Sequence, residues 1–451
     1  MAINSTQIEL LRKLLRHNAI DRVVRILQKF RPTDIAAIFP FLAPNELQSL
    51  LDILFEHGDV ADILLEIPDG ILEEDILLNL SDERIAHLLD QSAPDDAHHF
   101  VTLLNEERIE GILKKIRPSQ RERLRRLLNF PPESAGSLMN NQMITLPSEI
   151  SAQEAIETIR GKVNNTEFVF YIYVTNEAGT FLGVVPIRRL IVADPNQAIA
   201  EIMVADPIAV FATDDQEDVA EIVARYDLLA VPVVDENFKL LGVITVDDVI
   251  DVMREEATED MYLMQGLSDE DRVYSPVSKS VRKRFPWMVL NLFTAFCAAS
   301  VIGLFEESIS QVVILATFMP VVAGMGGNGG TQTLTVVTRA IAIGELSASE
   351  GKVAVLKQLT IGIINGAGVG ILTGLAAWLW KDNAVLGAVL FMAMLLNLAI
   401  AGFVGAAVPL LLKTLNLDPA LGGGVIVTTF TDIFGFLAFL GLATALLPYM
   451  L

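Results

Sequence analysis

The chain has 451 residues, 52% hydrophobic and 20% charged, with a formal net charge of −23. From Pro286 onward there are five Lys or Arg and seven Asp or Glu, which is −2, so residues 1–285 carry −21. This acidic half excludes nucleic acid as a partner and suits a cationic ligand such as a metal ion, while the lone Cys297 excludes a disulfide framework and a cysteine zinc cluster.

Residues 1–130 predict a series of short amphipathic helices. Segments such as "LLNLSDERIAHLLDQS" and "KKIRPSQRERLRRLL" place a turn or cap residue before an apolar stripe with i, i+3, i+4 spacing. Helices this short cannot bury an apolar face alone, so we expect them to stack into an all-α superhelical N-domain. No long apolar segment opens the chain, and no cleaved signal peptide is expected.

Residues 131–202 and 203–262 predict two copies of one β-α-β-β-α unit. The stretch "FVFYIYVTNEAGTFLGVVPIRRL" is echoed by "LLAVPVVDENFKLLGVITVDDVI". The equivalent glycines, Gly183 and Gly242, are 59 positions apart, and Val174 and Val234 are 60 apart. A tandem α/β duplication is the expected fold of this part.

Residues 245–261, "TVDDVIDVMREEATEDM", predict an acidic helix. Carboxylates at i, i+4 spacing oppose a helix by about 0.2–0.5 kcal/mol per pair, which favours a ligand that neutralises them. A solvated acidic helix and a divalent-cation site shared with other acids both fit this pattern. The stripe consists of Asp247, Asp251, Glu255 and Glu259, with Glu256 and Asp260 beside it.

The rest of the chain predicts a basic connecting helix at 263–284 and a membrane domain at 285–451 with five transmembrane helices. An odd number of spans puts the two termini on opposite sides, and the Lys and Arg near the span ends favour a cytoplasmic N-terminal half and an external C-terminus. The apolar runs, each long enough to cross about 30 Å, are 286–305, 310–342, 353–380, 384–412 and 419–447.

The membrane half contains no catalytic motif but does contain polar positions. We expect no enzyme activity, because His-Glu-x-x-His, Gly-x-Ser-x-Gly and Walker-type sequences are all missing. The segment "GMGGNGGTQ" (324–332) lies inside a predicted span, where glycines allow close helix packing or a broken helix lining a water-filled path. The candidate pore-lining residues are Asn328, Thr428 and Thr431.

Asp432 is the one charged residue between Pro419 and Leu451. A carboxylate at the centre of a span costs about 2.5–3.5 kcal/mol on insertion scales, so it indicates a function. Mg2+ is held by one or two carboxylates and keeps several of its waters. Two copies of Asp432 at the axis of a dimer would place −2 opposite a +2 ion, which predicts a divalent-cation site.

These features together resemble the MgtE family of magnesium channels. The resemblance rests on "FPPESAGSLM" (130–139), a repeat similar to a CBS domain pair, and "GMGGNGGTQ", "LDPA" (417–420) and "TTFTDIFG" (428–435) in the family's order. It implies a homodimeric Mg2+ uptake channel of the bacterial inner (plasma) membrane, with Asp432 binding the permeating ion and with closure at high cytoplasmic Mg2+. The alternative is a proton- or cation-coupled secondary transporter of divalent metals.

The resemblance also implies a cytoplasmic Mg2+ sensor and a nucleotide site. ATP is a further expected ligand, through Thr245 and Asp248 in the second CBS copy and Arg188 and Arg189 in the first. The family often has a polar side chain where this chain has Gly422, Gly423 and Gly424. The expected sensor acids are Asp90, Asp95, Asp96, Asp214, Asp218, Asp247, Asp251, Glu255, Glu256, Glu259 and Asp260.

Overall fold

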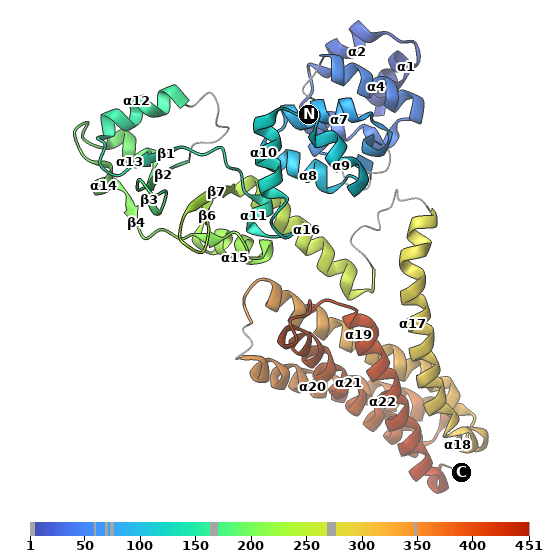
Figure 1. Ribbon diagram of the computed structural model, residues 1–451. Helices are drawn as coiled ribbons and strands as arrows, with labels where there is room; N and C mark the ends of the chain where they lie inside the picture. Colours follow the sequence, from blue (N-terminus) through green and yellow to red (C-terminus); the bar gives the residue numbers. More distant parts are fainter. Residues whose placement is uncertain are drawn as a thin grey trace. The chain divides into compact units, whose positions relative to one another are not determined.

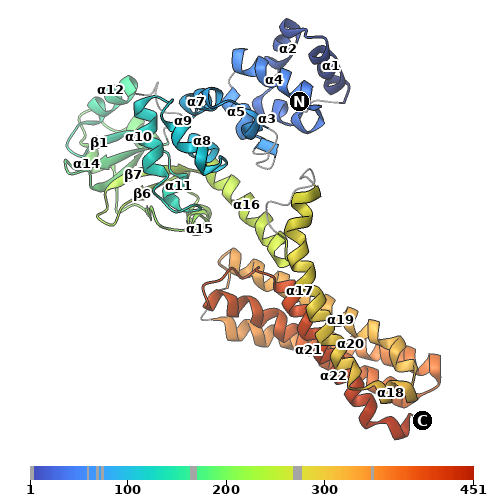
Figure 2. The same cartoon turned by 45° about the vertical axis from the view of Figure 1, so that its right-hand side comes forward.

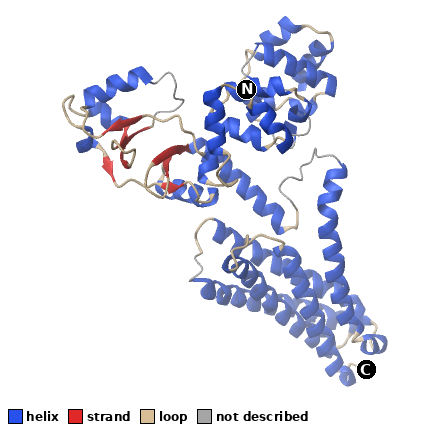
Figure 3. Cartoon of the chain, in the orientation of Figure 1, coloured by secondary structure: helices blue, strands red, loops and turns tan. Residues whose placement is uncertain are grey.

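The computed structural model describes residues 5–57, 60–67, 71–72, 76–162, 170–267, 277–346 and 350–450. The chain forms two compact units, Met1–Arg254 and Glu255–Leu451, which are described separately. Figure 1 labels their elements, and Figure 3 shows that the strands of the described residues belong to the first unit, whereas the second is helical.

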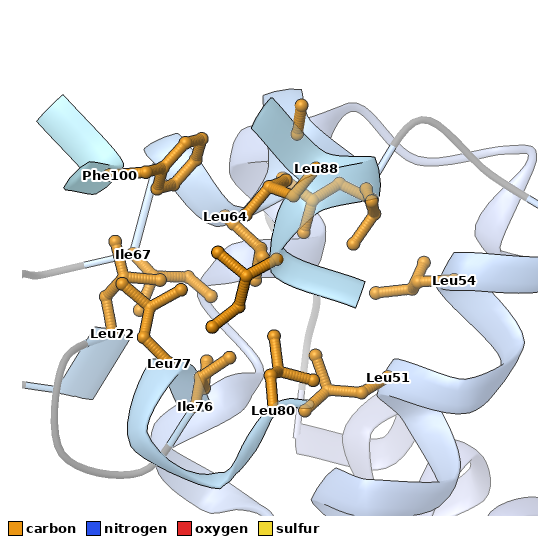
Figure 4. Packing of buried hydrophobic residues seen from close by; sticks show 14 of the residues in the cluster. Leu51, Leu54, Leu64, Ile67, Leu72, Ile76, Leu77, Leu80, Leu88 and Phe100 are labelled. Atoms are coloured by element: carbon orange, nitrogen blue, oxygen red, sulfur yellow. The ribbon is translucent and has the colours of Figure 1, made fainter. Parts of the chain in front are cut away.

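The first part of unit one is all-helical, as predicted. Prolines open several of its helices, where the missing N–H costs nothing, and Ser81 caps α7 by accepting from the Arg84 N–H. Leu64, Leu77 and Phe100 pack into one continuous apolar core (Figure 4). The helices are α1 (Ser5–Arg16), α2 (Ile20–Leu27), α3 (Pro32–Ala36), α4 (Pro44–His57), α5 (Val60–Leu65), α7 (Asp82–Gln91), α8 (Pro94–Thr102), α9 (Glu106–Leu113), α10 (Pro118–Leu127) and α11 (Ala135–Leu138), with 3-10 turns η1 (Phe39–Phe41) and η3 (Leu77–Asn79).

Two small sheets follow, and their topology confirms the predicted duplication. One has the order β1-β2-β3-β4 and the other β5-β6-β7, each with one parallel pair followed by an antiparallel hairpin. The elements are β1 (Thr145–Pro147), α12 (Ala152–Lys162), β2 (Tyr171–Thr175), β3 (Phe181–Pro186), α13 (Ile187–Val192), α14 (Ile199–Ile202), β4 (Val204–Ala205), β5 (Val210–Phe211), α15 (Gln216–Tyr226), β6 (Ala230–Val234) and β7 (Leu240–Thr245).

Glycine occupies the equivalent positions of the two copies for the same physical reason. A Cβ on Gly183 would lie 2.6 Å from the carbonyl oxygen of Val204, and a Cβ on Gly242 would lie 2.9 Å from that of Asn140. A neighbouring backbone therefore approaches each hairpin too closely for a side chain.

The acidic helix is confirmed, but the predicted connecting helix at 263–284 needs correction because it is interrupted. Helix α16 (Val246–Met264) continues from the second sheet and ends in a turn in which Gly266 has φ of +67°. Residues 268–276 lie outside the described residues, and α17 (Val277–Gly303) begins after them. The basic residues Arg282, Lys283 and Arg284 therefore belong to the first turns of a long apolar helix.

Unit two is a bundle in which α21 packs against α19, α20 and α22 (Figure 2). Among the described residues four helices, α17, α20, α21 and α22, are long and apolar enough to span a membrane by length and composition. Helix α19, which holds most of the predicted second span, has 29 residues but carries the glycine-rich polar segment. The remaining elements are α18 (Glu306–Gln311), α19 (Ile314–Ala342), α20 (Gly351–Lys381), α21 (Ala384–Thr414), α22 (Gly423–Ala445) and the 3-10 turn η6 (Leu447–Tyr449).

Helices α20 and α21 pack backbone to backbone. Gly362, Gly366, Gly370 and Gly374 are four residues apart on α20 and share one face. A Cβ on any of them would lie 2.3–2.8 Å from a main-chain atom of α21. Small residues at this spacing let two helices in lipid approach closely, so the pair forms a rigid hairpin.

Candidate functional site

Asp432 lies within α22, one turn after Thr428, and is half-buried within the protomer. The threonines beside it donate to their own helix: Thr428 Oγ1 to the Gly424 carbonyl at 2.9 Å and Thr429 Oγ1 to that of Val425 at 2.6 Å. Their lone pairs remain available as oxygen ligands. Among the described residues no three acids, histidines or cysteines gather closely enough to hold a metal, so one chain alone supplies a single carboxylate here.

Helix α19 supplies a second polar surface next to α22. A Cβ on Gly327 would lie 3.6 Å from Cγ2 of Thr428, so these helices are adjacent at that level. Asn328 is exposed on α19, as is Gln332 one turn later. Thr431 instead is fully buried, close to Gly330, and donates to the Thr428 carbonyl at 3.0 Å. Its burial does not support the predicted pore-lining role, whereas Asn328, Thr428 and Asp432 remain accessible.

Asn397 fixes the spacing of these two helices; a polar residue in an apolar span usually bonds a neighbouring helix, but the sequence did not reveal which helices this one joins. Its side chain is fully buried on α21, and Nδ2 donates to the Val322 carbonyl of α19 at 2.8 Å. A Cβ on Gly326 or Gly435 would lie 2.4 or 2.7 Å from that same Nδ2. The amide therefore occupies a gap that glycines of α19 and α22 create. In the sequence Asn397 is one of several polar residues in apolar spans, which gives no sign of this position.

The three glycines at the start of α22, with Gly422 as its N-cap, form the contact between the end of α16 and the start of α22. The Gly422 N–H donates to the Leu263 carbonyl at 3.0 Å, and Gly422 has φ of +59°. A Cβ on Gly424 would lie 2.5 Å from the carbonyl oxygen of Met264, and a Cβ on Gly422 would lie 2.8 Å from the Trp287 ring. The expected side chain is missing because α16 and Trp287 occupy its space.

Acids gather at this same end of α16. Burial raises the pKa of Asp260 to about 6, the carboxylates of Asp418 and Glu256 add to the increase, and Arg339 opposes it. Asp418 belongs to the "LDPA" segment, and its Oδ1 accepts from the Ala420 N–H at 2.6 Å. No local pattern in the sequence singles out Asp418, because only the fold brings it near α16.

A second acidic group lies inside unit one, between α8 and α16. Burial, followed by the charges of Asp96 and Asp248, raises the pKa of Asp95 to about 8. Burial also raises the pKa of Asp248 to about 6, although the Thr245 hydroxyl donates to it at 2.8 Å. Asn140 Nδ2 donates to Asp95 at 3.2 Å. The structure thus brings the predicted sensor acid Asp95 close to Asp248, which the sequence assigned to the nucleotide site, and the two carboxylates raise each other's cost of ionisation.

Other predicted sensor acids have local partners. Asp90 accepts from the Arg117 backbone N–H at 2.9 Å and lies 3.4 Å from its Nε. Asp214 accepts from the Phe211 N–H at 2.7 Å within a turn, and Asp218 lies in the first turn of α15. On α16, Asp251 is 70% exposed and 3.4 Å from Arg254. The local partners of Asp90 and Asp214 explain these two acids without a metal.

The expected nucleotide residues lie in unit one on three elements, β7, α16 and α13. Thr245 and Asp248 bond each other, and the cavity beside Thr245 has a volume of about 20 Å3, which is room for one water. Arg188 and Arg189 are exposed on α13 in the first copy.

In the cation-free protein, the contribution of Asp95 to the stability of unit one should fall as pH rises from about 4 to about 8. The pKa of Asp95 is raised from 3.8 to about 8, so the folded state holds a proton that the unfolded state releases, and stability is lost as pH climbs through this window. Asp95→Asn should remove most of this dependence and stabilise the protein at pH 8 by about 1–3 kcal/mol. Hydrogen exchange of the α8 amides, measured at each pH for the parent and the variant, gives the free energies of unfolding that check this.

The matched control for Asp95 is Asp251→Asn, since Asp251 is exposed on the same unit. This variant should have the same free energy of unfolding as the parent at about pH 4 and at about pH 8. Lower stability of Asp95→Asn at pH 8 would show that the carboxylate is needed for folding, contrary to expectation.

A helical domain, paired α/β sheets, an acidic helix and an apolar bundle carrying one lone acid define a multidomain membrane protein. The family model for MgtE, described as a divalent cation transporter, matches residues 319–442, and the MgtE intracellular N domain matches residues 5–133. The CBS domain model matches residues 135–196 and 199–255. The chain belongs to the MgtE family of magnesium transporters, and it is not an enzyme.

One curated relative matches almost the whole chain, and another matches about three quarters of it. A magnesium transporter MgtE of Bacillus subtilis (strain 168) is 33% identical over 453 residues, covering 99% of each chain. One of Thermus thermophilus is 31% identical over 333 residues, covering 73% of this chain and 74% of that protein.

Two solved structures resemble part of the chain. The crystal structure of the soluble part of a magnesium transporter is 27% identical, covers 56% of this chain and 98% of that chain, and has a TM-score of 0.50. The cytosolic domain of the Mg2+ channel MgtE in complex with ATP is 28% identical, covers 54% and 98%, and also has a TM-score of 0.50.

Proposed function

We propose that this chain forms a homodimeric Mg2+ channel of the bacterial plasma membrane, closed by Mg2+ bound to its acidic cytoplasmic part. One observation carries the proposal: Asp432 is accessible at the middle of α22, beside Thr428 and Asn328, in a family of magnesium transporters. A carboxylate in that position costs free energy unless a cation visits it.

The proposed topology has five spans, with α19 as the second. Helix α19 packs against both α21 and α22, and its exposed Asn328 lines the water-filled path of the proposed dimer, so this polar side chain need not meet lipid. The cytoplasmic end then holds Arg339, Lys352, Lys357 and Lys413, whereas the opposite end holds Lys381. This bias favours residues 1–285 in the cytoplasm and the C-terminus outside.

Permeation in this proposal uses a partly hydrated ion. Two Asp432 carboxylates, one from each subunit, neutralise one Mg2+. Thr428 and Asn328 form hydrogen bonds with the waters that the ion keeps. Mg2+ dehydrates reluctantly, so a site with few direct ligands holds it without trapping it. A monovalent ion would leave one carboxylate charge uncompensated.

Closure in this proposal acts through α16. The helix carries sensor acids along its length and ends at the glycines that begin α22. Without Mg2+, carboxylates repel one another within each acidic group, the one near Asp95 and the one near Asp260. A bound ion removes that repulsion, and its higher affinity for the closed arrangement is the driving force. ATP is a proposed second ligand of the CBS part, supported by a relative's complex with ATP.

Voltage-clamped patches containing the purified protein test this function. A channel gives single-channel Mg2+ currents whose reversal potential follows the Mg2+ gradient and ignores pH. The competing function is a proton-coupled transporter, since acids inside a membrane also serve as proton relays. A reversal potential that shifts with the proton gradient would replace the channel with that transporter.

A further inference from the structure

Helices α20 and α21 separate at the end where α20 begins and α21 ends. Their glycine contacts reach from Gly374 and Gly387 at one end to Gln358 and Gly402 at the other. Beyond Gln358 the glycine contact is with a side chain and not with the main chain, since a Cβ on Gly351 would lie 3.3 Å from Cδ1 of Leu410. A groove of about 540 Å3 lies at this end, within the usual range of ligand sites. It is lined by Gly351, Lys352 and Val355 of α20 and by Ala407, Leu410 and Lys413 of α21, among others.

The groove combines apolar walls with a cationic rim. Val355 and Leu410 form its walls, and Lys352 and Lys413 stand at its mouth, both exposed. Neither ammonium is joined in an ion pair to any residue that the structure describes. The groove therefore offers an acyl chain an apolar surface and a phosphate two cations.

The depth of the groove matches the headgroup region of a bilayer. Helices α20 and α21 each have 31 residues, about 46 Å at 1.5 Å per residue, against a hydrocarbon core of about 30 Å. With the glycine contacts in the core, Lys352 and Lys413, each one residue from a helix end, fall among the headgroups.

We propose that this groove binds one anionic phospholipid, with an acyl chain along Val355 and Leu410 and the phosphate between Lys352 and Lys413. Basic pockets between membrane helices on the cytoplasmic side recognise lipids of this charge, at about 1 kcal/mol for each Lys near the surface. The inference rests on the proposed topology, which places this end at the cytoplasmic leaflet. The binding itself needs no ion transport.

Native mass spectrometry of the full-length protein, supplied with phosphatidylglycerol or phosphatidylcholine, tests the site. The wild type should retain phosphatidylglycerol preferentially. The double variant Lys352→Gln/Lys413→Gln should bind it about 30-fold more weakly, as expected for two lysines. Lys381→Gln, at the opposite end of α20, is the matched control and should retain the lipid. Equal retention of both lipids by the wild type, or unchanged binding by the double variant, overturns the proposal.

A second variant separates the apolar part of the site from its charge. Ala407→Phe fills the groove while both lysines stay, and it should also lose the lipid. Retention by this variant would contradict a seated acyl chain.

A second copy of the chain could also cover this groove, and that occupant can be detected. In a Cys297→Ser background, Leu411→Cys provides one thiol at the groove. Efficient oxidative cross-linking between subunits would show that a partner covers it and would overturn the lipid site. Lipid retention is measured without an ion gradient, so the two proposals can fail separately. Loss of lipid binding with intact Mg2+ currents would count against the lipid site alone, and lipid binding without Mg2+ currents would count against the channel alone.

Discussion

Replacing Asp432 with asparagine should abolish Mg2+ uptake. The amide keeps the shape of the side chain but leaves a divalent ion without its compensating charge in both subunits. Removing one partner of a buried charge pair costs about 3–5 kcal/mol, which is more than two powers of ten in occupancy. Growth of a strain that lacks its own Mg2+ uptake, on low Mg2+, measures the loss, and a Mg2+-sensitive dye in proteoliposomes gives the rate.

Asp382→Asn is the control for this loss. Asp382 is an acid of the same unit that lies at the C-terminal end of α20 and not inside a helix, and its left-handed backbone, with φ of 50°, is one that asparagine tolerates. This variant should support growth like the parent. Asp432→Glu, which keeps the charge on a longer side chain, should retain partial uptake. Full rescue by Asp432→Asn would remove the carboxylate from the permeation path and with it the proposed ion site.

Neutralising the acidic stripe of α16 should give a channel that stays open at millimolar cytoplasmic Mg2+. The variant combines Asp247→Asn, Asp251→Asn, Glu255→Gln and Glu259→Gln. Removing the charges removes both the repulsion in the absence of ions and the affinity for Mg2+ in the closed arrangement, so Mg2+ loses its differential effect. Open probability in excised patches, recorded while Mg2+ is raised on the cytoplasmic side, measures the result.

The control for the stripe removes the same number of charges elsewhere. Four exposed glutamates away from α16 are changed to glutamine together, which lowers the net acidity equally. If this control also stays open, the effect comes from overall charge and not from the stripe. Normal closure of the stripe variant itself would exclude these acids as the sensor. The four control positions are Glu106, Glu107, Glu201 and Glu236.

Local patterns in the sequence were enough for most of the elements. Gly183 and Gly242 occupy equivalent positions in the two sequence repeats, which predicted the duplicated sheets. Both positions need glycine because a neighbouring backbone approaches closely at each. The predicted helix at 263–284 is interrupted because Gly266 turns the chain there, and a single glycine does not by itself show where a helix ends. The apolar run at 310–342 predicted a second span, but α19 is not among the four helices of the described residues that are apolar enough to cross a membrane by composition, because it carries the glycine-rich polar segment.

By itself the sequence determined that one half of this protein is acidic, that the other half is apolar, and that Asp432 stands alone in a span. Those features follow from residue type and order, which decide solvation. Only the tertiary structure decided which polar groups stay accessible: Thr428 does, while Thr431 is buried against Gly330. It also showed that the glycines at the start of α22 contact the end of α16. The reason is physical, since side-chain contacts depend on how helices distant in sequence pack.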